Sequence, residues 1–500
     1  MKFNNRVQNP NKTTNHEGAK AFKVNAKLEL YSAVVASFLS DAFYEKDDKR
    51  LSRICKLVEI LAEKDALFVA QLAVYARTSM NLRTTPLVLA VELAKYHKGD
   101  NLVRRTVRKV IQRADEITEI LAYYQQTNPR TKSKKLSGLS KQLQLGIGDA
   151  FNRFNEYQFA KYNRANEVKL RDALFLTHPK AKDQAQQVLF DKIVSKTLDV
   201  PYTWETALSM AGQQEGLDKS EVWEELVKSG KMGYMALLRN LRNIANHQIS
   251  QEVVDIIARR IADPEEVVRS RQFPFRFVAA YREIGELQSP HTEKMLEALE
   301  TAVKHSAARI SGFDQNTSVL VATDLSASMM TPLSQKSMIS YQDVGLVLSL
   351  LLKSKCKEVR IGLFGETYKV IDEVSDNILE AVENLKSIYV GHATNGHLVI
   401  QNLIETGIIV DKIMIFSDLQ FWLTNYSGNM DISTYWFRYK KIAPHAKLYM
   451  FDLAGYGTTP VETGPGNITY LSGWSDKIFD MLSAIEEGSD AISEIEQVEV

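Results

Sequence analysis

The chain has 500 residues, 45% hydrophobic and 25% charged, so it can bury ample core and is expected to fold as two or more domains. No apolar run reaches the ~18 residues that a membrane-spanning helix needs, and the polar start at Met1 does not indicate a secretory signal. Cys55 and Cys356 lie in different predicted domains, so we expect no disulfide, no zinc site and a cytoplasmic protein.

The net charge of +1 hides an uneven distribution. From Ser318 onward there are 13 Lys+Arg and 23 Asp+Glu, a net charge of −10, which leaves 49 basic and 38 acidic residues, or +11, before it. Between residues 130 and 180 the chain has 11 basic and 4 acidic residues. This uneven charge predicts that the basic first part of the chain binds a polyanion and that the acidic second part binds a cation.

Residues 1–25 are rich in Asn, Lys and Thr and are expected to form an N-terminal arm. From 26 to 315 nearly every segment has helical periodicity, with short loops and no strand-like alternation. Helix pairs without a strict sequence repeat predict an all-α, HEAT-like solenoid. The clearest predicted helices are 51–64, 67–77, 86–96, 102–113, 222–228 and 252–261.

Basic and aromatic side chains are concentrated between residues 130 and 180. Lysine and arginine neutralise phosphates, and exposed aromatic rings can stack on unpaired bases. Phe151, Phe154 and Phe159 are expected in the core, because helical aromatic residues usually pack inward, whereas Tyr162 could take either position. The candidate RNA-binding residues are Lys134, Lys135, Lys141, Lys161, Arg164, His178 and Lys180.

From Ser318 the pattern changes to alternating strands and helices, which predicts a doubly wound α/β domain over 316–484. Strands are expected at 319–322, 360–364, 367–371, 412–416, 447–452 and 468–471, and helices at 341–353, 377–388, 398–405 and 477–484. Residues 485–500 have six acidic and no basic residues and are expected to form a solvated, mobile tail.

Oxygen-bearing side chains follow two of the predicted strands. Asp324, Ser326 and Ser328 come after the strand at 319–322, Asp418 follows the strand at 412–416, and Thr394 lies in a loop before a helix. Parallel sheets bind ligands outside the carboxyl ends of their strands, and Mg²⁺ prefers one or two carboxylates, neutral oxygens and water. The five residues therefore form a candidate site for a divalent cation, and Mg²⁺ is the preferred candidate. Alternatively, Ser326 or Ser328 serves only as the N-cap of a helix, and Asp418 is only a loop residue.

This order, Asp-x-Ser-x-Ser, then a distant Thr, then a distant Asp, resembles the metal-ion-dependent adhesion site of von Willebrand factor A domains. In similar domains the cation binds an incoming carboxylate at its open position, which implies docking without catalysis. The sequence has no Asp-x-Asp phosphatase motif, no Walker loop and no Ser/His/Asp set near the strand ends. His392 and His397 are expected to shape the Thr394 loop.

A helical solenoid before such a domain resembles the TROVE (telomerase, Ro and vault) family, and within it the Ro autoantigen group and its bacterial counterparts. The resemblance covers residues 22 to 484. Its most specific segments are YARTSMNLRT at 75–84, MALLRNLRN at 235–243, and KYNR at 161–164 followed by DALFLTHPK at 172–180.

The resemblance implies a non-enzymatic, monomeric RNA-binding protein whose helices form a ring that the A-type domain joins. It also implies that Y-like small RNA binds the basic outer surface, that single-stranded ends of misfolded RNA enter the ring, and that an exoribonuclease such as polynucleotide phosphorylase is tethered for RNA quality control. Lys141, Lys161 and His178 match basic positions of the family. Arg164 does not match as cleanly, because the family's arginine stands where this chain has Ala165.

Several alternatives stay open on the sequence alone. His178, which precedes a proline, could be a structural residue that closes a helix. Arg77, Arg83, Arg239 and Arg242 could line the ring or pair inside the fold. The whole protein could be a metal-dependent docking adaptor whose solenoid binds protein, whereas a metal phosphohydrolase is disfavoured, since no nucleophile or base is evident.

Overall fold

The computed structural model describes residues 11–36, 45–128, 138–162, 167–213, 218–307, 310, 313, 316–335, 337–422, 431–464 and 467–500. The chain divides into two compact units, and both are discontinuous in sequence. Unit 1 combines Met1–Arg50, Tyr234–Asn246 and Val254–Ala491; unit 2 combines Leu51–Gly233, His247–Val253 and Ile492–Val500. This division differs from the linear boundaries at 26–315 and 316–484. No helix among the described residues is both long and apolar enough to cross a bilayer.

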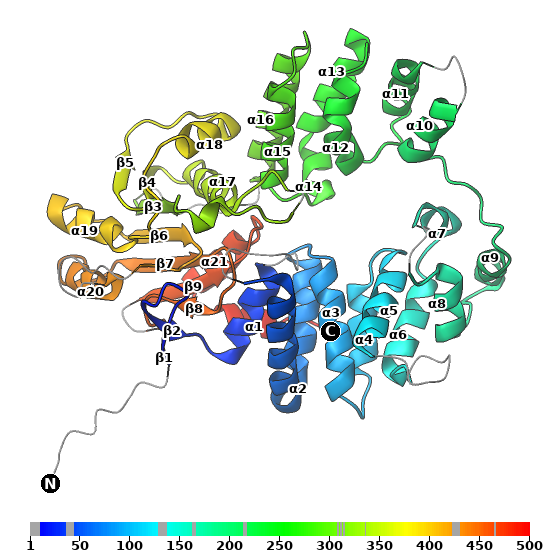
Figure 1. Ribbon diagram of the computed structural model, residues 1–500, viewed down its shortest axis with the longest axis horizontal. Helices are drawn as coiled ribbons and strands as arrows, with labels where there is room; N and C mark the ends of the chain where they lie inside the picture. Colours follow the sequence, from blue (N-terminus) through cyan, green and yellow to red (C-terminus); the bar gives the residue numbers. More distant parts are fainter. Residues whose placement is uncertain are drawn as a thin grey trace. The chain divides into compact units, whose positions relative to one another are not determined.

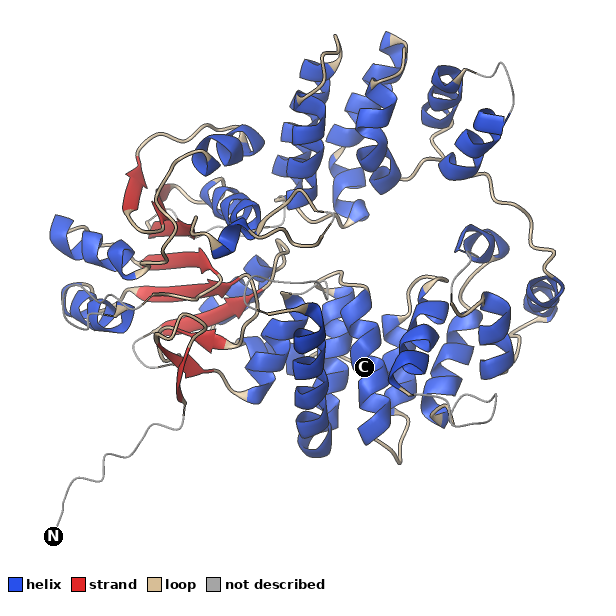
Figure 2. Ribbon diagram, in the orientation of Figure 1, coloured by secondary structure: helices blue, strands red, loops and turns tan. Residues whose placement is uncertain are grey.

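Unit 2 is helical throughout its described residues, as predicted (Figure 1, Figure 2). Most of these helices pack mainly on the next or next but one in the chain, as in helical repeats. The predicted break between the first two helices lies inside α2 (Asp47–Thr78), where Asp65 has non-helical angles, φ −155° and ψ 69°. The other helices are α3 (Thr84–Tyr96), α4 (Leu102–Val110), α5 (Glu116–Thr127), α6 (Lys141–Phe151), α7 (Glu156–Tyr162), α8 (Leu170–Thr177), α9 (Gln184–Ser195), α10 (Trp204–Gln213) and α11 (Lys219–Lys228).

A buried carboxylate joins three of these helices. Glu116, which begins α5, has a fully buried side chain and accepts a 2.8 Å bond from the guanidinium of Arg77 in α2. Its second oxygen accepts from the backbone N–H groups of Gln112 and Arg113, just after α4. A paired, hydrogen-bonded charge of this kind can be buried, whereas removal of one partner would be costly.

Unit 1 contains the remaining helical segments and a six-stranded sheet. The helical segments are α1 (Ala26–Val35), α12 (Tyr234–Ala245), α13 (Gln251–Ala262, from Val254 on), α14 (Pro264–Ser270), α15 (Phe275–Gly285) and α16 (Thr292–Ser306). Arg282 of α15 donates to both oxygens of Asp343 and to Glu383. Glu300 of α16 accepts from the backbone N–H of Glu380. The last helices are therefore joined to the sheet domain by hydrogen bonds.

The sheet has the order β5-β4-β3-β6-β7-β9, in which only β5 is antiparallel to its neighbour. The predicted strands and helices are all present: β3 (Ser318–Asp324), β4 (Glu358–Phe364), β5 (Tyr368–Ile371), β6 (Lys412–Ser417), β7 (Lys447–Asp452), β9 (Ile468–Ser472), α17 (Tyr341–Lys353), α18 (Ile378–Lys386), α19 (His397–Thr406) and α21 (Ile478–Glu486). The strand order reverses at β3, so the carboxyl ends of β3 and β6 flank the crevice where doubly wound sheets bind ligands.

Two expectations for the ends of the chain need correction. Instead of a free arm, β1 (Lys12–Thr14) and β2 (Lys20–Lys23) form a hairpin whose second strand pairs with β8 (Thr458–Thr459). The acidic tail contains α22 (Ala491–Glu496), with Ile495 fully buried. Val500 is also buried, and its carbonyl accepts a hydrogen bond from Arg105. Charge composition predicted solvation, but the alternating apolar residues of this segment pack instead.

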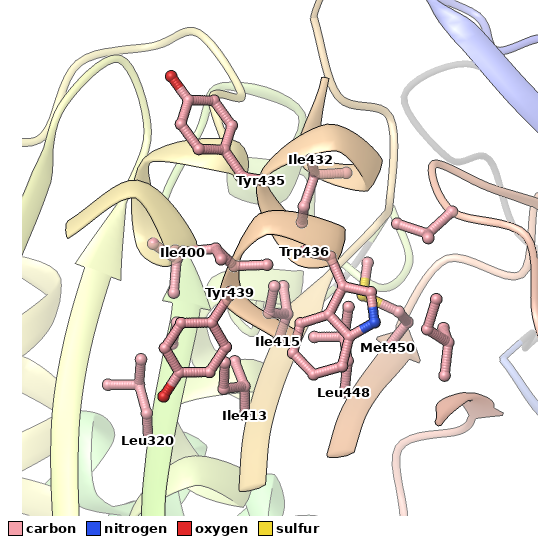
Figure 3. Packing of buried hydrophobic residues seen from close by; sticks show 14 of the residues in the cluster. Leu320, Ile400, Ile413, Ile415, Ile432, Tyr435, Trp436, Tyr439, Leu448 and Met450 are labelled. Carbon is pink, nitrogen blue, oxygen red and sulfur yellow. The ribbon is translucent and has the colours of Figure 1, made fainter. Parts of the chain in front are cut away.

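The core of the sheet domain lies between the sheet and two helices, α19 and α20 (Ile432–Ile442), as Figure 3 shows. Leu320 and Ala322 point to this side, whereas Thr323 bonds to Ser349 of α17 on the other, as the two-residue period of a strand requires. Trp436 is fully buried in this core.

We predict that Trp436→Ala costs about 3–5 kcal/mol of domain stability, because it leaves a large cavity in a core that cannot collapse to fill it. The measurement is urea unfolding together with hydrogen exchange of the β6 and β7 amides. Phe437→Ala is the matched control, since this neighbouring ring is 47% exposed. An equal loss of stability in both variants would contradict the assigned packing.

Candidate functional site

Two carboxylates lie buried at neighbouring strand ends in unit 1. Asp324 ends β3 and Asp418 directly follows β6, and their exposed fractions are 0% and 2%. Asp324 accepts hydrogen bonds from the Ser326 backbone N–H (2.8 Å) and the Ser417 hydroxyl (2.5 Å). Asp418 Oδ1 accepts from the backbone N–H of Gln420. Both carboxylates therefore lie at the same edge of the sheet, where β3 and β6 end side by side.

The Asp-x-Ser-x-Ser loop and the Thr394 loop meet at the same place. Ser326 and Ser328 are buried, and their hydroxyl oxygens are 3.4 Å apart. The backbone N–H of Ala327 donates to the carbonyl of His392. That of Trp422, beyond Asp418, donates to the carbonyl of Thr394, whose side chain is buried. All five predicted ligands thus belong to three loops that hydrogen bonds join.

Glycine permits the close approach of the Thr394 loop. Gly391 has a φ of +83°, and a Cβ there would lie 2.3 Å from the Cβ of Glu366. At Gly396 a Cβ would lie 2.2 Å from the ring of Phe421. Any larger residue at either position would push the loop away from the strand ends.

The electrostatics of the two carboxylates are unfavourable without a cation. Burial raises the pKa of Asp324, although hydrogen bonds from Ser417 and Ser326 oppose the shift. Burial, and then the negative charge of Asp324, raises the pKa of Asp418, although hydrogen bonds from the Ser328 hydroxyl and the Gln420 N–H oppose the shift. In addition, Asp418 Oδ2 is buried and has no hydrogen-bond partner among the described residues. A buried, unpartnered carboxylate oxygen beside a second carboxylate fits a cation-binding site.

The donor set suits a hard cation. It consists of two carboxylates and three hydroxyls, and no group of three or more His, Cys, Asp or Glu side chains suited to a metal occurs in the described part of the chain. A third buried carboxylate, Asp452 at the end of β7, is already satisfied. Its oxygens accept from the N–H groups of Ala454 and Gly455 and from the Tyr470 hydroxyl.

Two supporting residues were missed by sequence reasoning. Ser417 holds Asp324, and its place beside Asp418 at the strand end is a signal that could have identified it. Gln342 donates to the carbonyls of Leu325 and Ser326 and so connects α17 to the Asp-x-Ser-x-Ser loop, but no sequence pattern indicates it. The backbone carbonyl of His392 accepts a hydrogen bond from Ala327, and the ring of His397 stacks on that of Tyr435, with their centroids 5.7 Å apart. Both histidines thus lie in or beside the Thr394 loop.

On unit 2, three of the predicted RNA-binding residues lie along one edge of α6. Lys141 begins α6 and donates to Gln144, whose amide donates in turn to the carbonyl of Leu176 at the end of α8. His178 follows in a left-handed conformation, φ 47°, and caps α8. The carbonyl of Lys180 accepts from Asn152, next to the end of α6. Lys141, His178 and Lys180 are all exposed.

The other predicted RNA-binding residues lie elsewhere or outside the described residues. Lys161 lies in the last turn of α7, and its ammonium lies over the rings of Tyr157 and Tyr162. Lys134, Lys135 and Arg164 are outside the described residues. His178 does close a helix, as the structural alternative held, and its contact with RNA stays a prediction.

Of the four arginines considered for a ring, three are paired. Arg77 binds Glu116, Arg83 binds Asp115 and Arg242 binds Glu283. Within the described residues Arg239 has no ion pair, and its charge lowers the pKa of Arg276, although burial is the larger cause of that shift. The internal pairing that the sequence left open holds for Arg77, which is buried and also donates to the carbonyl of Val110 at the end of α4, whereas Arg83 and Arg242 are paired but not buried.

The fold is similar to that in the crystal structure of the Deinococcus radiodurans RO (RSR) protein, with a TM-score of 0.61 and 15% identity over 91% of this chain and 99% of that one. At this identity the likeness shows the fold: helical repeats with a von Willebrand factor A-like α/β domain.

Two curated relatives are each described as telomerase protein component 1. The Mus musculus protein is 25% identical over 347 residues and the Rattus norvegicus protein 24% over 345 residues, in each case 53% of this chain. The chain spans 13% of the length of these relatives. The TROVE domain family matches residues 19–199 and 195–338, which together make up more than half of the sequence. The chain therefore belongs to the TROVE domain family.

Proposed function

We propose that this protein binds Y-like small RNA on the exposed basic edge of α6 and α8 and single-stranded ends of misfolded RNA elsewhere on its helical repeats, in RNA quality control. Membership in the TROVE family implies RNA binding as such. The observation that carries the proposal for this surface is the alignment of Lys141, His178 and Lys180, all exposed, along one helix edge. Phosphate contacts supply most non-specific affinity for nucleic acid and fix its orientation.

In this proposal the α/β domain is a docking site and carries out no reaction. Asp324, Ser326, Ser328, Thr394 and Asp418 would hold Mg²⁺, and the ion would offer an open position to a carboxylate of a protein partner such as an exoribonuclease. The buried and unpartnered Asp418 Oδ2 supports this assignment. A cation there would neutralise two carboxylates whose repulsion the hydrogen bonds from Ser417, Ser326 and Ser328 offset only in part.

We predict that Lys141→Gln combined with Lys180→Gln weakens RNA binding and lowers the slope of log K against log salt by about 2, because each lost phosphate contact removes about 0.9 for a duplex. The measurement is fluorescence anisotropy with a hairpin RNA at several salt concentrations.

Lys56→Gln with Lys64→Gln is the charge-matched control for this experiment, since both lysines are exposed on α2 in the same unit. If the two double variants have the same slope, the α6–α8 edge is not the RNA surface. If the unmodified protein binds no RNA and purifies at mild salt without nucleic acid, the docking-adaptor alternative is favoured.

For the cation, we predict that Mg²⁺ or Mn²⁺ at 100 times its dissociation constant raises the stability of the unmodified protein by about 2.7 kcal/mol. Asp418→Asn should abolish the rise in Tm, because it removes one of the two anionic ligands. The same variant should not lower the Tm of metal-free protein, since it also removes a buried like charge. Differential scanning calorimetry with and without EDTA measures both effects.

Asp411→Asn serves as the matched control, because Asp411 lies at the opposite end of β6, is exposed and accepts hydrogen bonds from Ser318. It should respond to Mg²⁺ as the unmodified protein does. The metal site would be refuted if neither Mg²⁺ nor Mn²⁺ raised the Tm of the unmodified protein. It would also be refuted if the ions raised the Tm of Asp418→Asn as much as that of the unmodified protein.

A further inference from the structure

The aromatic residues of the basic segment fall into two classes. Phe151, Phe154 and Phe159 pack on one another, with ring centroids 5.8 Å apart in two of the pairs, and all are buried. The tyrosines of α7 behave differently: Tyr157 is 47% exposed, and Tyr162 is half-buried. The phenylalanines therefore position α7, and its tyrosines remain free to meet a ligand.

The two tyrosines alternate with two cations. The guanidinium of Arg113 lies 4.5 Å from the ring centroid of Tyr162. The ammonium of Lys161 lies 5.7 Å from the same centroid and 5.8 Å from that of Tyr157. We call Arg113, Tyr162, Lys161 and Tyr157 the α7 row. Because Lys161 is close to both rings, their centroids are at most 11.5 Å apart, about the length of three stacked nucleotide steps of ~3.4 Å.

One end of the row is held in place by the fold. Arg113 donates through Nε and Nη2 to the carboxylate of Asp115, at 3.1 and 2.8 Å. Asp115 is also bonded to Arg83, which pairs in turn with Glu116 and Glu119. Arg113 therefore keeps its plane against Tyr162, while Lys161 has a flexible stem and can turn from the rings to a phosphate.

Another exposed tyrosine of unit 2 lacks this setting. Tyr202 is 43% exposed, and the ammonium of Lys231 lies 5.7 Å from its ring centroid. Its hydroxyl, however, donates to the carboxylate of Glu225. A carboxylate beside the ring repels phosphate, so the same ring and lysine make a poor nucleotide site there.

We propose that the α7 row is a binding site for unpaired RNA nucleotides, in which bases stack on Tyr157 and Tyr162 and the flanking Lys161 and Arg113 neutralise their phosphates. This inference rests on the proposed RNA-binding function and makes it specific, because stacking requires bases that are free of a duplex. It also separates two surfaces: the α6–α8 edge contacts phosphates, and the α7 row contacts bases.

The test compares two ligands on the full-length protein: a 12-nucleotide oligouridylate and a blunt 12-base-pair RNA duplex, at the same salt. Tyr157→Leu combined with Tyr162→Leu keeps apolar bulk and removes the aromatic faces. Affinity for the oligouridylate should fall by about 5- to 150-fold for each base stack lost, and duplex affinity should change by no more than about 2-fold, since phosphate contacts dominate it. Tyr157→Phe combined with Tyr162→Phe should restore oligouridylate binding.

Tyr202→Leu is the matched control and should bind oligouridylate as the unmodified protein does. Circular dichroism checks the folding of each variant, and Tyr157→Leu alone, at the more exposed ring, provides a milder substitution. As an independent measurement, an oligonucleotide with 4-thiouridine should crosslink to the peptide that contains residues 157–162.

The possible failures are distinguishable. Unchanged oligouridylate affinity in the double leucine variant, or an equal loss for both ligands, would overturn the α7 row alone. Binding of the duplex but not of oligouridylate by the unmodified protein would overturn the row and the proposed binding of single-stranded ends, and leave the proposed binding of Y-like RNA at the α6–α8 edge standing. Binding of neither ligand would overturn both.

Discussion

Two like charges buried side by side impose the main constraint on the α/β domain. Asp324 and Asp418 lie out of water at adjacent strand ends, and burial raises the pKa of each. Neighbouring residues reduce the cost of this arrangement. Ser417 and Ser326 donate hydrogen bonds to Asp324, and Gln342 donates to the carbonyl of Leu325 in the loop that follows it. An incompletely satisfied pair of this kind is costly in a structural core, and this pair lies at the topological switch point of the sheet, where doubly wound folds bind ligands.

The same region is connected to the helical repeats of unit 1. Asp343, in the first turn of α17, accepts hydrogen bonds from Arg282 of α15 and Lys386 of α18. Burial would raise the pKa of Asp343, but these cations outweigh it and hold the pKa below its usual value. The preceding residue, Gln342, donates to the carbonyls of Leu325 and Ser326 in the Asp-x-Ser-x-Ser loop. A short path of hydrogen bonds thus runs from a helical repeat to the candidate cation site.

Sequence patterns predicted what depends on local chemistry. The period of buried residues and the alternation of strands and helices predicted the sheet and most helices, and the strand ends indicated where the candidate oxygen ligands lie. The contributions of distant segments escaped prediction, because no local pattern signals them. Examples are the pairing of β2 with β8, the packing of Ile495, and Gln342. Likewise, composition located the basic segment and helical packing predicted a buried Phe159, but only the structure shows that Tyr157 is exposed and Tyr162 half-buried.

The pairing of β2 with β8 has a consequence for how the molecule is made. Phe22 lies opposite Thr459, and the two positions are 437 residues apart in sequence. At ~5–20 residues per second, a ribosome needs about 20–90 s to supply the second after the first. Throughout that interval the N-terminal hairpin has an unpaired edge, which is a hazard for aggregation. The nascent chain therefore depends on late closure by its own distal part, and a chaperone that shields this edge would raise the yield.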